Sequence, residues 1–308
     1  MELKKPINTA LKVCLGLKDN ESCLIITDAG KKDIGKKFYE QALMISEKTE
    51  MIEIPIMEIN GQEPSVRLNK IYDVALFVTT KSLTHTDFRK QLSRQGTRIA
   101  SMPGITEDII KRAIDVDYEK IDNLNKKIKE ILEKTSVVEI KTKKGTDLKL
   151  RLKKGRDIKM DGGLFINKGD CGNLPGGEVF LAPEEGTTNG ILIVDKSMAG
   201  VGKLTEPLKI TIKNGFLETV EGKDSVKFLS NFKGLDKNAF LVAELGIGTN
   251  YKAKVTGVVL EDEKVKGTAH IAFGNNSGFG GNNNVPLHLD GVFSDPEIKC
   301  DGTVLDLM

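Results

Sequence analysis

The sequence predicts two domains: an α/β N-terminal domain with a mostly parallel sheet, then a β-rich α+β C-terminal domain. A length of 308 residues suits two domains of roughly 100–200 residues each. Up to about residue 115, apolar strand-like runs alternate with amphipathic helical patterns, as in sheets covered by helices. After residue 136 the chain alternates with period two between Gly and Asn turns, which indicates hairpins. We therefore divide the chain into residues 1–135 and 136–308.

The N-terminal domain should contain strands that alternate with helices. The expected strands are 22–28, 51–57, 73–80 and 98–104. Residues 31–49 carry apolar side chains at spacings of three and four, which is typical of an amphipathic helix. A second helix is expected within 84–95, where a Thr or Asp would cap its first turn. This alternation favours a mostly parallel sheet with both faces covered.

Residues 118–134 carry the strongest helical pattern of the chain. Their apolar side chains form one stripe and the other faces are charged, so we expect a connecting helix packed on a domain. Two hairpins should follow. The first surrounds Gly145, and the second surrounds Asn214-Gly215, which is the strongest short hairpin signal.

Composition excludes several classes of function. The net charge is only +2, because 44 acidic residues offset 46 basic ones, so the concentrated basic field of nucleic-acid-binding proteins is absent. No apolar run approaches the roughly 20 residues that span a bilayer, and the N-terminus lacks a secretory signal. The cysteines are too scattered for a disulfide framework or a zinc knuckle; they are Cys14, Cys23, Cys171 and Cys300. We expect a cytoplasmic protein with reduced thiols and neither nucleic-acid nor membrane partners.

Five side chains of the C-terminal half are candidate metal ligands. They are Glu178, Glu244, His270, His288 and Asp290. His288 and Asp290 are two residues apart, so on a strand they point to the same face. His270 lies in a run whose opposite face is apolar. A carboxylate within an apolar strand is costly to bury unless it is paired or bound to a metal. For each Glu the alternative is a salt bridge with one of the many lysines.

The donor types allow two kinds of metal site. Three carboxylates and two neutral imidazoles would be neutralised by two divalent ions and a hydroxide, and carboxylate-rich sites with His suit two adjacent ions. Alternatively, His270, His288 and Asp290 would form the two-His, one-carboxylate triad of non-haem iron oxygenases. In that case neither glutamate would bind the ion.

Four sequence blocks around these residues resemble a known family. NLPGGEVFLAP, ELGIGTN, DEKVKGTAHIAFG and PLHLD occur in this order within residues 171–291 and are similar to the signature blocks of the aminopeptidase T/aminopeptidase S family of thermophilic-type metallo-aminopeptidases. The resemblance implies removal of N-terminal amino acids from short peptides by a homodimer. It also implies two divalent ions (zinc, cobalt, manganese or magnesium) on Glu178, Glu244, His270, His288 and Asp290.

This chain departs from that family at one position, and a related family offers another function. The family commonly has a Tyr shortly after the His of the third block, where this chain has Ser277. Ring-opening dioxygenases that act on dihydroxypyridines are similar to the family, use one iron and keep the His and His-x-Asp residues. Because both glutamates are present, we predict the two-metal aminopeptidase. The dioxygenase and a non-catalytic metal-binding homologue remain the alternatives. No general base is assigned, and Glu263 is expected at the surface.

Overall fold

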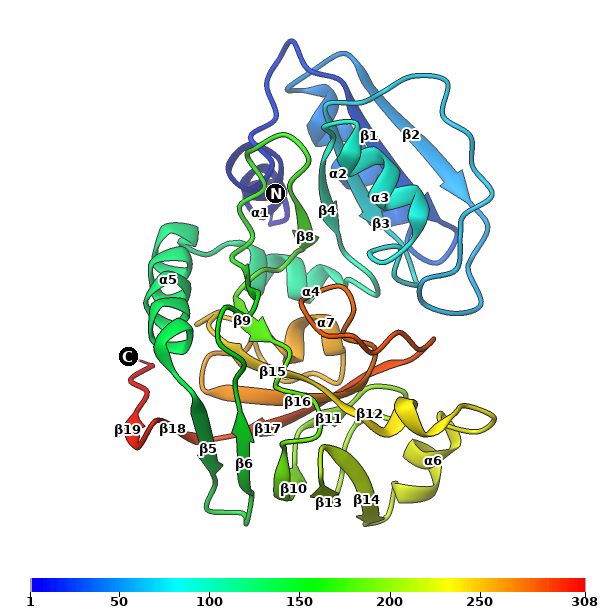
Figure 1. Cartoon of the computed structure of the whole chain (residues 1–308). Helices are drawn as coiled ribbons and strands as arrows, with labels where there is room; N and C mark the ends of the chain where they lie inside the picture. Colours follow the sequence, from blue (N-terminus) through cyan, green and yellow to red (C-terminus); the bar gives the residue numbers. More distant parts are fainter. Residues whose placement is uncertain (1, 308) are drawn as a thin grey trace. The chain divides into compact units, whose positions relative to one another are not determined.

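The computed structural model describes residues 2–307 and forms two compact units. The first comprises the chain up to Tyr118 together with Gly163–Gly176, and the second comprises Glu119–Gly162 together with the chain from Gly177 onward. Figure 1 labels the elements of each unit. No helix among residues 2–307 combines the length and the apolar composition that crossing a bilayer demands.

The units depart in two places from the expected division at residue 135. The helix expected to end the first domain falls, after its first residue, in the second unit. Its apolar side chains Ile128 and Leu132 pack into the core of that unit. Segment 163–176 returns to the first unit, because its strand pairs in parallel with a strand of that unit's sheet.

The first unit is the predicted α/β domain. Its sheet has five strands in the order β2-β1-β3-β4-β8, and every neighbouring pair is parallel. The strands are β1 (Cys23–Asp28), β2 (Thr49–Ile54), β3 (Val74–Val78), β4 (Arg98–Ser101) and β8 (Cys171–Asn173). All residues of β1 and β3 are buried, as expected for strands covered on both faces.

Two helices cover opposite faces of this sheet. In α2 (Lys32–Leu43), Gly35 lies so close to Thr27 of β1 that a Cβ would stand 2.7 Å from its Oγ1. In α3 (Asp87–Arg94), Leu92 belongs to the same buried apolar cluster as Ile26. Ile26 precedes Thr27 in β1, so its side chain points to the opposite face of the sheet. Thr86 caps α3 by accepting a hydrogen bond from the Arg89 backbone N–H at 3.1 Å, as the sequence predicts. The remaining helical segments of the unit are α1 (Lys4–Asn8), η1 (Thr9–Cys14), α4 (Glu107–Ile109) and η2 (Ile110–Ile114).

The second unit contains two seven-stranded antiparallel sheets. The hairpin sheet, in spatial order, consists of β14 (Phe216–Glu221), β13 (Leu208–Lys213), β10 (Asn189–Val194), β6 (Asp147–Arg151), β5 (Val137–Lys141), β18 (Glu297–Cys300) and β19 (Thr303–Val304). The β16 sheet consists of β12 (Gly202–Lys203), β11 (Ser197–Met198), β17 (His288–Ser294), β16 (Thr268–Gly274), β15 (Val242–Gly248), β9 (Glu178–Leu181) and β7 (Ile158–Asp161). The helices of the second unit are α5 (Tyr118–Lys134), α6 (Ser225–Ser230), η3 (Lys237–Phe240) and α7 (Val259–Asp262).

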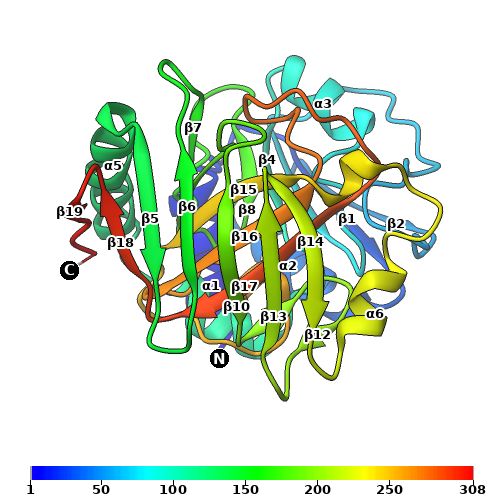
Figure 2. The same cartoon turned by 60° about the horizontal axis from the view of Figure 1, so that its bottom comes forward.

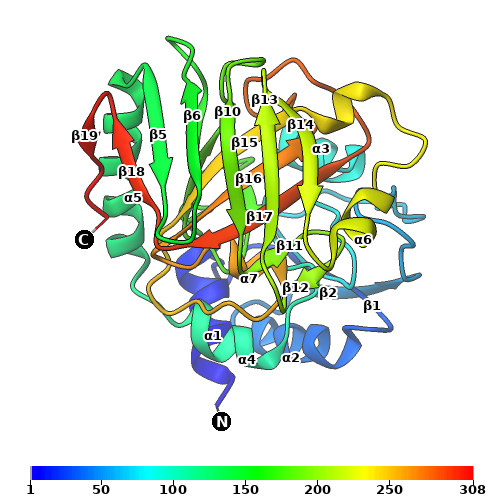
Figure 3. The ribbon, with the colours of Figure 1, turned by 90° about the horizontal axis from the view of Figure 1, so that it is seen from below.

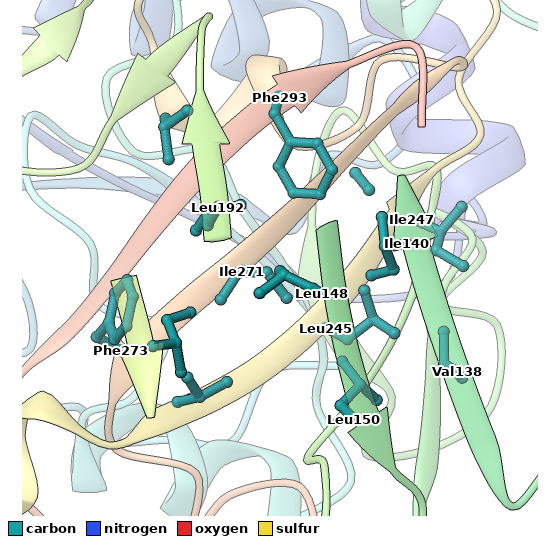
Figure 4. Close-up of a cluster of buried hydrophobic side chains, with 14 of the residues drawn as sticks. Val138, Ile140, Leu148, Leu150, Leu192, Leu245, Ile247, Ile271, Phe273 and Phe293 are labelled. Carbon is teal, nitrogen blue, oxygen red and sulfur yellow. The ribbon is translucent and has the colours of Figure 1, made fainter. Parts of the chain in front are cut away.

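The two sheets of the second unit pack face to face. Figures 2 and 3 look onto the hairpin sheet, behind which β15, β16 and β17 run diagonally. Apolar side chains from both sheets fill the space between them (Figure 4). The labelled residues are Val138, Ile140, Leu148, Leu150 and Leu192 of the hairpin sheet, and Leu245, Ile247, Ile271, Phe273 and Phe293 of the β16 sheet. One face of the β16 sheet therefore packs in the core.

Both predicted hairpins are confirmed. β5 pairs with β6 around the turn at Gly145, and β13 pairs with β14 around Asn214-Gly215. The φ angles of Asn214 and Gly215 are 49° and 78°, the left-handed conformation that a two-residue hairpin turn requires. No disulfide joins any of the four cysteines, all of which lie within the described residues.

Candidate metal centre

The structure brings all five sequence-predicted side chains to one face of the β16 sheet. Glu178 begins β9, Glu244 lies on β15, His270 on β16, and His288 and Asp290 on β17. Directly opposed residues of an antiparallel pair share a face, and the register places Ala272 of β16 opposite both Glu244 and Asp290. The intervening residues, such as Leu245 and Ile271, face the core.

The two imidazoles converge on the carboxylate of Glu244. Nε2 of His270 lies 3.1 Å from Oε1 of Glu244, and Nε2 of His288 lies 3.4 Å from Oε2. Oδ1 of Asp290 is 3.3 Å from Nε2 of His288. Glu178 stands at the other side, with Oε2 3.7 Å from Nε2 of His270. The His288 side chain is 26% exposed and the other four are buried, so the cluster opens to solvent beside His288.

The hydrogen bond of His288 fixes which nitrogen faces the cluster. Its Nδ1 lies 2.7 Å from the backbone oxygen of Asn275, and a carbonyl oxygen can only accept, so Nδ1 carries the hydrogen. In the neutral ring, Nε2 then presents a lone pair to the oxygens of Glu244 and Asp290. Lone pairs that face one another repel, so this arrangement calls for a cation between them. Histidine ligands of metals commonly have this second hydrogen bond to a carbonyl.

Among the five candidate side chains, two buried polar atoms have no hydrogen-bond partner within the described residues. They are Oε2 of Glu178 and Nδ1 of His270. Buried polar atoms are ordinarily hydrogen-bonded. Oε2 of Glu178 points toward His270, where a cation would satisfy it.

The pKa values show the same excess of negative charge. Burial lowers the pKa of His270, but the hydrogen bond to Glu244 and the surrounding carboxylates outweigh burial and raise it to about 9. For His288 burial is again outweighed, chiefly by Asp290, so that its pKa lies well above the ordinary value. Burial raises the pKa of Asp290, but the charge of His288 and its hydrogen bond hold it below its usual range. Without a metal, protons on the imidazoles would neutralise these carboxylates, and a metal ion would replace those protons.

Sequence reasoning missed a second group of charged residues beside Glu178. The Nζ of Lys264 donates to Oε1 of Glu178 at 2.5 Å and to Oε1 of Glu263 at 2.7 Å, and lies 3.9 Å from Oδ2 of Asp161. The Lys264 side chain is 1% exposed. Burial lowers the pKa of this lysine, but the three carboxylates outweigh burial and raise it above its ordinary value. Lys264 is therefore an ammonium ion.

Two sets of donor atoms are close enough to hold a metal ion. In each set the ligand atoms lie within 4.8 Å of one another. The sets are Glu244, His270 and Asp290, and Glu178, Glu263 and His270. Nitrogen and carboxylate oxygen donors without a thiolate suit divalent iron, manganese and related ions. The buried cluster can bind metal, as the sequence predicts.

The structure also places Glu263 and Ser277. Glu263 was expected at the surface, but its side chain is only 13% exposed and touches Lys264. Ser277 is exposed and hydrogen-bonds Asn275 through its backbone N–H and its hydroxyl, so it supplies no replacement for a phenol.

The ring of Phe279 contacts His288 edge-on, with centroids 5.9 Å apart, and Phe180 contacts Phe279 at 5.4 Å. This aromatic pair lies beside the most exposed of the five side chains.

Comparisons with known proteins identify similar families and folds. The model of the family NicX, described as 2,5-dihydroxypyridine 5,6-dioxygenase, matches residues 11–306. The chain is similar to the solved structure of 2,5-dihydroxypyridine dioxygenase from Pseudomonas putida KT2440, with a TM-score of 0.81 and 17% identity over 98% of this chain and 94% of that one. It is also similar to AmpT from Thermus thermophilus, with a TM-score of 0.72 and 17% identity over 100% of this chain and 97% of that one. A search of curated proteins found no match.

The family match contradicts the predicted two-metal aminopeptidase. The match supports an enzyme, but neither a hydrolase nor a protease. The likeness to AmpT supports the fold that the resemblance implied. The prediction went wrong because it took the presence of Glu178 and Glu244 as the sign of a second ion. The ammonium of Lys264 already satisfies one oxygen of Glu178.

The space for the His270 ring depends on a glycine opposite it. A Cβ on Gly246 would stand 2.0 Å from Nε2 of His270, and this buried ring has nowhere to move. We expect Gly246→Ala to weaken metal binding by at least about tenfold, as loss of a ligand's support does. Titration of the metal-free protein with Co²⁺ measures the affinity.

Gly278→Ala is the matched control for this variant. No atom lies within 4 Å of a Cβ placed on Gly278, so its affinity should equal that of the wild type. Equal affinities in both variants would show that the close approach of Gly246 to His270 has no bearing on the metal.

Proposed function

The chain belongs to the NicX family of 2,5-dihydroxypyridine 5,6-dioxygenases, and we propose that it cleaves the ring of a dihydroxylated pyridine with dioxygen at one bound ferrous ion. The observation that carries this proposal is the position of Asp290, whose Oδ1 lies 3.3 Å from Nε2 of His288 and which belongs with Glu244 and His270 to a set of donor atoms close enough to hold an ion, in a chain whose family match spans residues 11–306. Two imidazoles and one carboxylate are the ligand set of non-haem Fe(II) oxygenases.

The proposed ligands of the ion are Nε2 of His270, Nε2 of His288 and a carboxylate oxygen of Asp290. The lone pair of His288 that faces Asp290 supports this set, since its Nδ1 is engaged by Asn275. When bound, a ferrous ion supplies the redox chemistry through which dioxygen reacts with an aromatic ring, at positions that the three protein ligands leave open.

The proposed reaction takes no atoms or electrons from the protein. A dioxygenase transfers both oxygen atoms of dioxygen to the substrate, and cleavage between C5 and C6 breaks one ring bond, so no external reductant enters the balance. The protein must bind the ring, exclude water and accept the proton that a ring hydroxyl releases on binding. The burial of Glu178, Glu244, His270 and Asp290 supports the exclusion of water.

Glu244 is the proposed proton acceptor. Because Nε2 of both histidines would bind the ion, neither ring would donate to Glu244 in the loaded centre, and the positive charge of the ion would favour the ionised carboxylate. Its two oxygens face both imidazoles, next to the proposed ion. A hydroxyl of the bound substrate would therefore come within reach of an oxygen of Glu244.

The aromatic pair at the open side supports an aromatic substrate. Phe279 lies edge-on to His288, and Phe180 edge-on to Phe279. Aromatic rings favour edge-to-face and offset contacts with one another, so a planar pyridine ring that enters beside His288 would find such partners. Neither ring offers a hydrogen bond to a peptide.

The direct test is ring cleavage by protein loaded with Fe²⁺ under anaerobic conditions. On addition of 2,5-dihydroxypyridine and dioxygen, we expect equimolar consumption of both and loss of the aromatic absorbance. Asp290→Asn should lower metal content and reduce turnover by at least about 100-fold, because it removes a charged ligand. Asp295→Asn, which changes an exposed carboxyl group, is the control. Full turnover in Asp290→Asn, or no ring cleavage by the loaded wild type, would rule out the proposal.

A second variant separates binding of the ion from transfer of the proton. Glu244→Gln keeps the shape of the side chain but removes the base, so we expect one bound ion per chain and a kcat lower by about 10²–10⁴-fold. Elemental analysis and dioxygen consumption measure the two quantities. Loss of the ion from this variant would instead make Glu244 a ligand.

A further inference from the structure

We propose that Lys264 restricts this centre to one metal ion, because its ammonium group occupies the place at Glu178 that a second ion would need. The inference rests on the proposed function, since it presupposes an ion at His270, His288 and Asp290.

The second set of donor atoms is where another ion would bind. It consists of Glu178, Glu263 and His270. Because Nε2 of His270 has one lone pair and would bind the first ion, a second ion would be held by the two glutamates. In two-metal sites the ions are about 3.5–4 Å apart and share a bridging carboxylate. Glu178 is the carboxylate in a position to do this, with Oε2 on the side of His270 and Oε1 on the side of Lys264.

Lys264 already binds the carboxylates of this second set. Its Nζ lies 2.5 Å from Oε1 of Glu178 and 2.7 Å from Oε1 of Glu263. A divalent ion on the same oxygens would stand beside the ammonium in a site that water does not reach. Repulsion between like charges is strong where solvent is excluded, so the two cations exclude each other.

Main-chain hydrogen bonds fix the backbone at Lys264. Its carbonyl oxygen accepts from the Asn250 N–H at 2.8 Å, and the Lys266 N–H donates to the Asn250 carbonyl at 3.0 Å. Gly248 allows this segment to approach β15, since a Cβ there would stand 2.2 Å from the carbonyl oxygen of Val265. The main chain is therefore fixed at Lys264, and its ammonium is held by the hydrogen bonds to Glu178 and Glu263.

The carboxylates around the centre form two groups, one beside Lys264 and one beside the imidazoles. Asp161, Glu178 and Glu263 surround Lys264, while Glu244 and Asp290 flank the imidazoles. The single positive charge of Lys264 partly neutralises the first group and leaves the second group to the ion. Glu178 then stays bonded to Lys264 and would not bind the ion.

The test is the number of Mn²⁺ ions per chain in metal-free protein titrated with excess Mn²⁺, counted by elemental analysis after desalting. Electron paramagnetic resonance distinguishes one isolated Mn²⁺ from two spin-coupled ions. We expect one isolated ion in the wild type and two coupled ions in Lys264→Met. Lys264→Arg, which keeps the charge, should bind one ion, as should Lys266→Met, which changes an exposed lysine two residues along the chain.

Each other outcome overturns a specific claim. Two ions in the wild type, or one ion in folded Lys264→Met, would overturn the role of Lys264. If Lys264→Met does not fold, we expect two coupled ions in Lys264→Gln instead. The number of Mn²⁺ ions bound by the wild type remains decisive. No bound ion in the wild type would overturn the proposed function, and the inference with it.

Discussion

The centre depends on the burial of negative charge. Five carboxyl groups lie on or beside one face of the β16 sheet, while the opposite face of that sheet is filled by the core. They belong to Asp161, Glu178, Glu244, Glu263 and Asp290. Buried carboxylates are tolerated only with cationic partners, and Lys264 provides one. The lone pair of His288 faces the oxygens of Glu244 and Asp290, and a further cation is needed there.

Local patterns predicted the elements and the face that bears the site. Alternation along a strand is enough to place His288 with Asp290 and to assign Ile271 to the core, and Asn214-Gly215 is enough to predict a hairpin turn. The pattern of residues 118–134 predicts an apolar stripe but not which core receives it, so the helix was assigned to the first domain. The return of Gly163–Gly176 to the first sheet has no local signal, because strand pairing is decided by distant partners.

The function was harder to predict because sequence blocks show which groups are buried but not what they touch. Glu178 and Glu244 look alike in sequence, and both end up buried. Glu178, however, bonds Lys264, which lies 86 residues away, while Glu244 faces the imidazoles. DEKVKG gives no indication that its first lysine is buried. Ser277, which stands where aminopeptidases commonly have Tyr, is the local departure from the residues of a peptidase.

Anomalous diffraction at the iron absorption edge, from crystals of the ferrous-loaded protein, tests the account most directly. The account predicts a single iron peak bounded by Nε2 of His270, Nε2 of His288 and the Asp290 carboxylate, with the Lys264 ammonium still on Glu178. Two peaks that share Glu178, or one peak between Glu178 and Glu263, would contradict it.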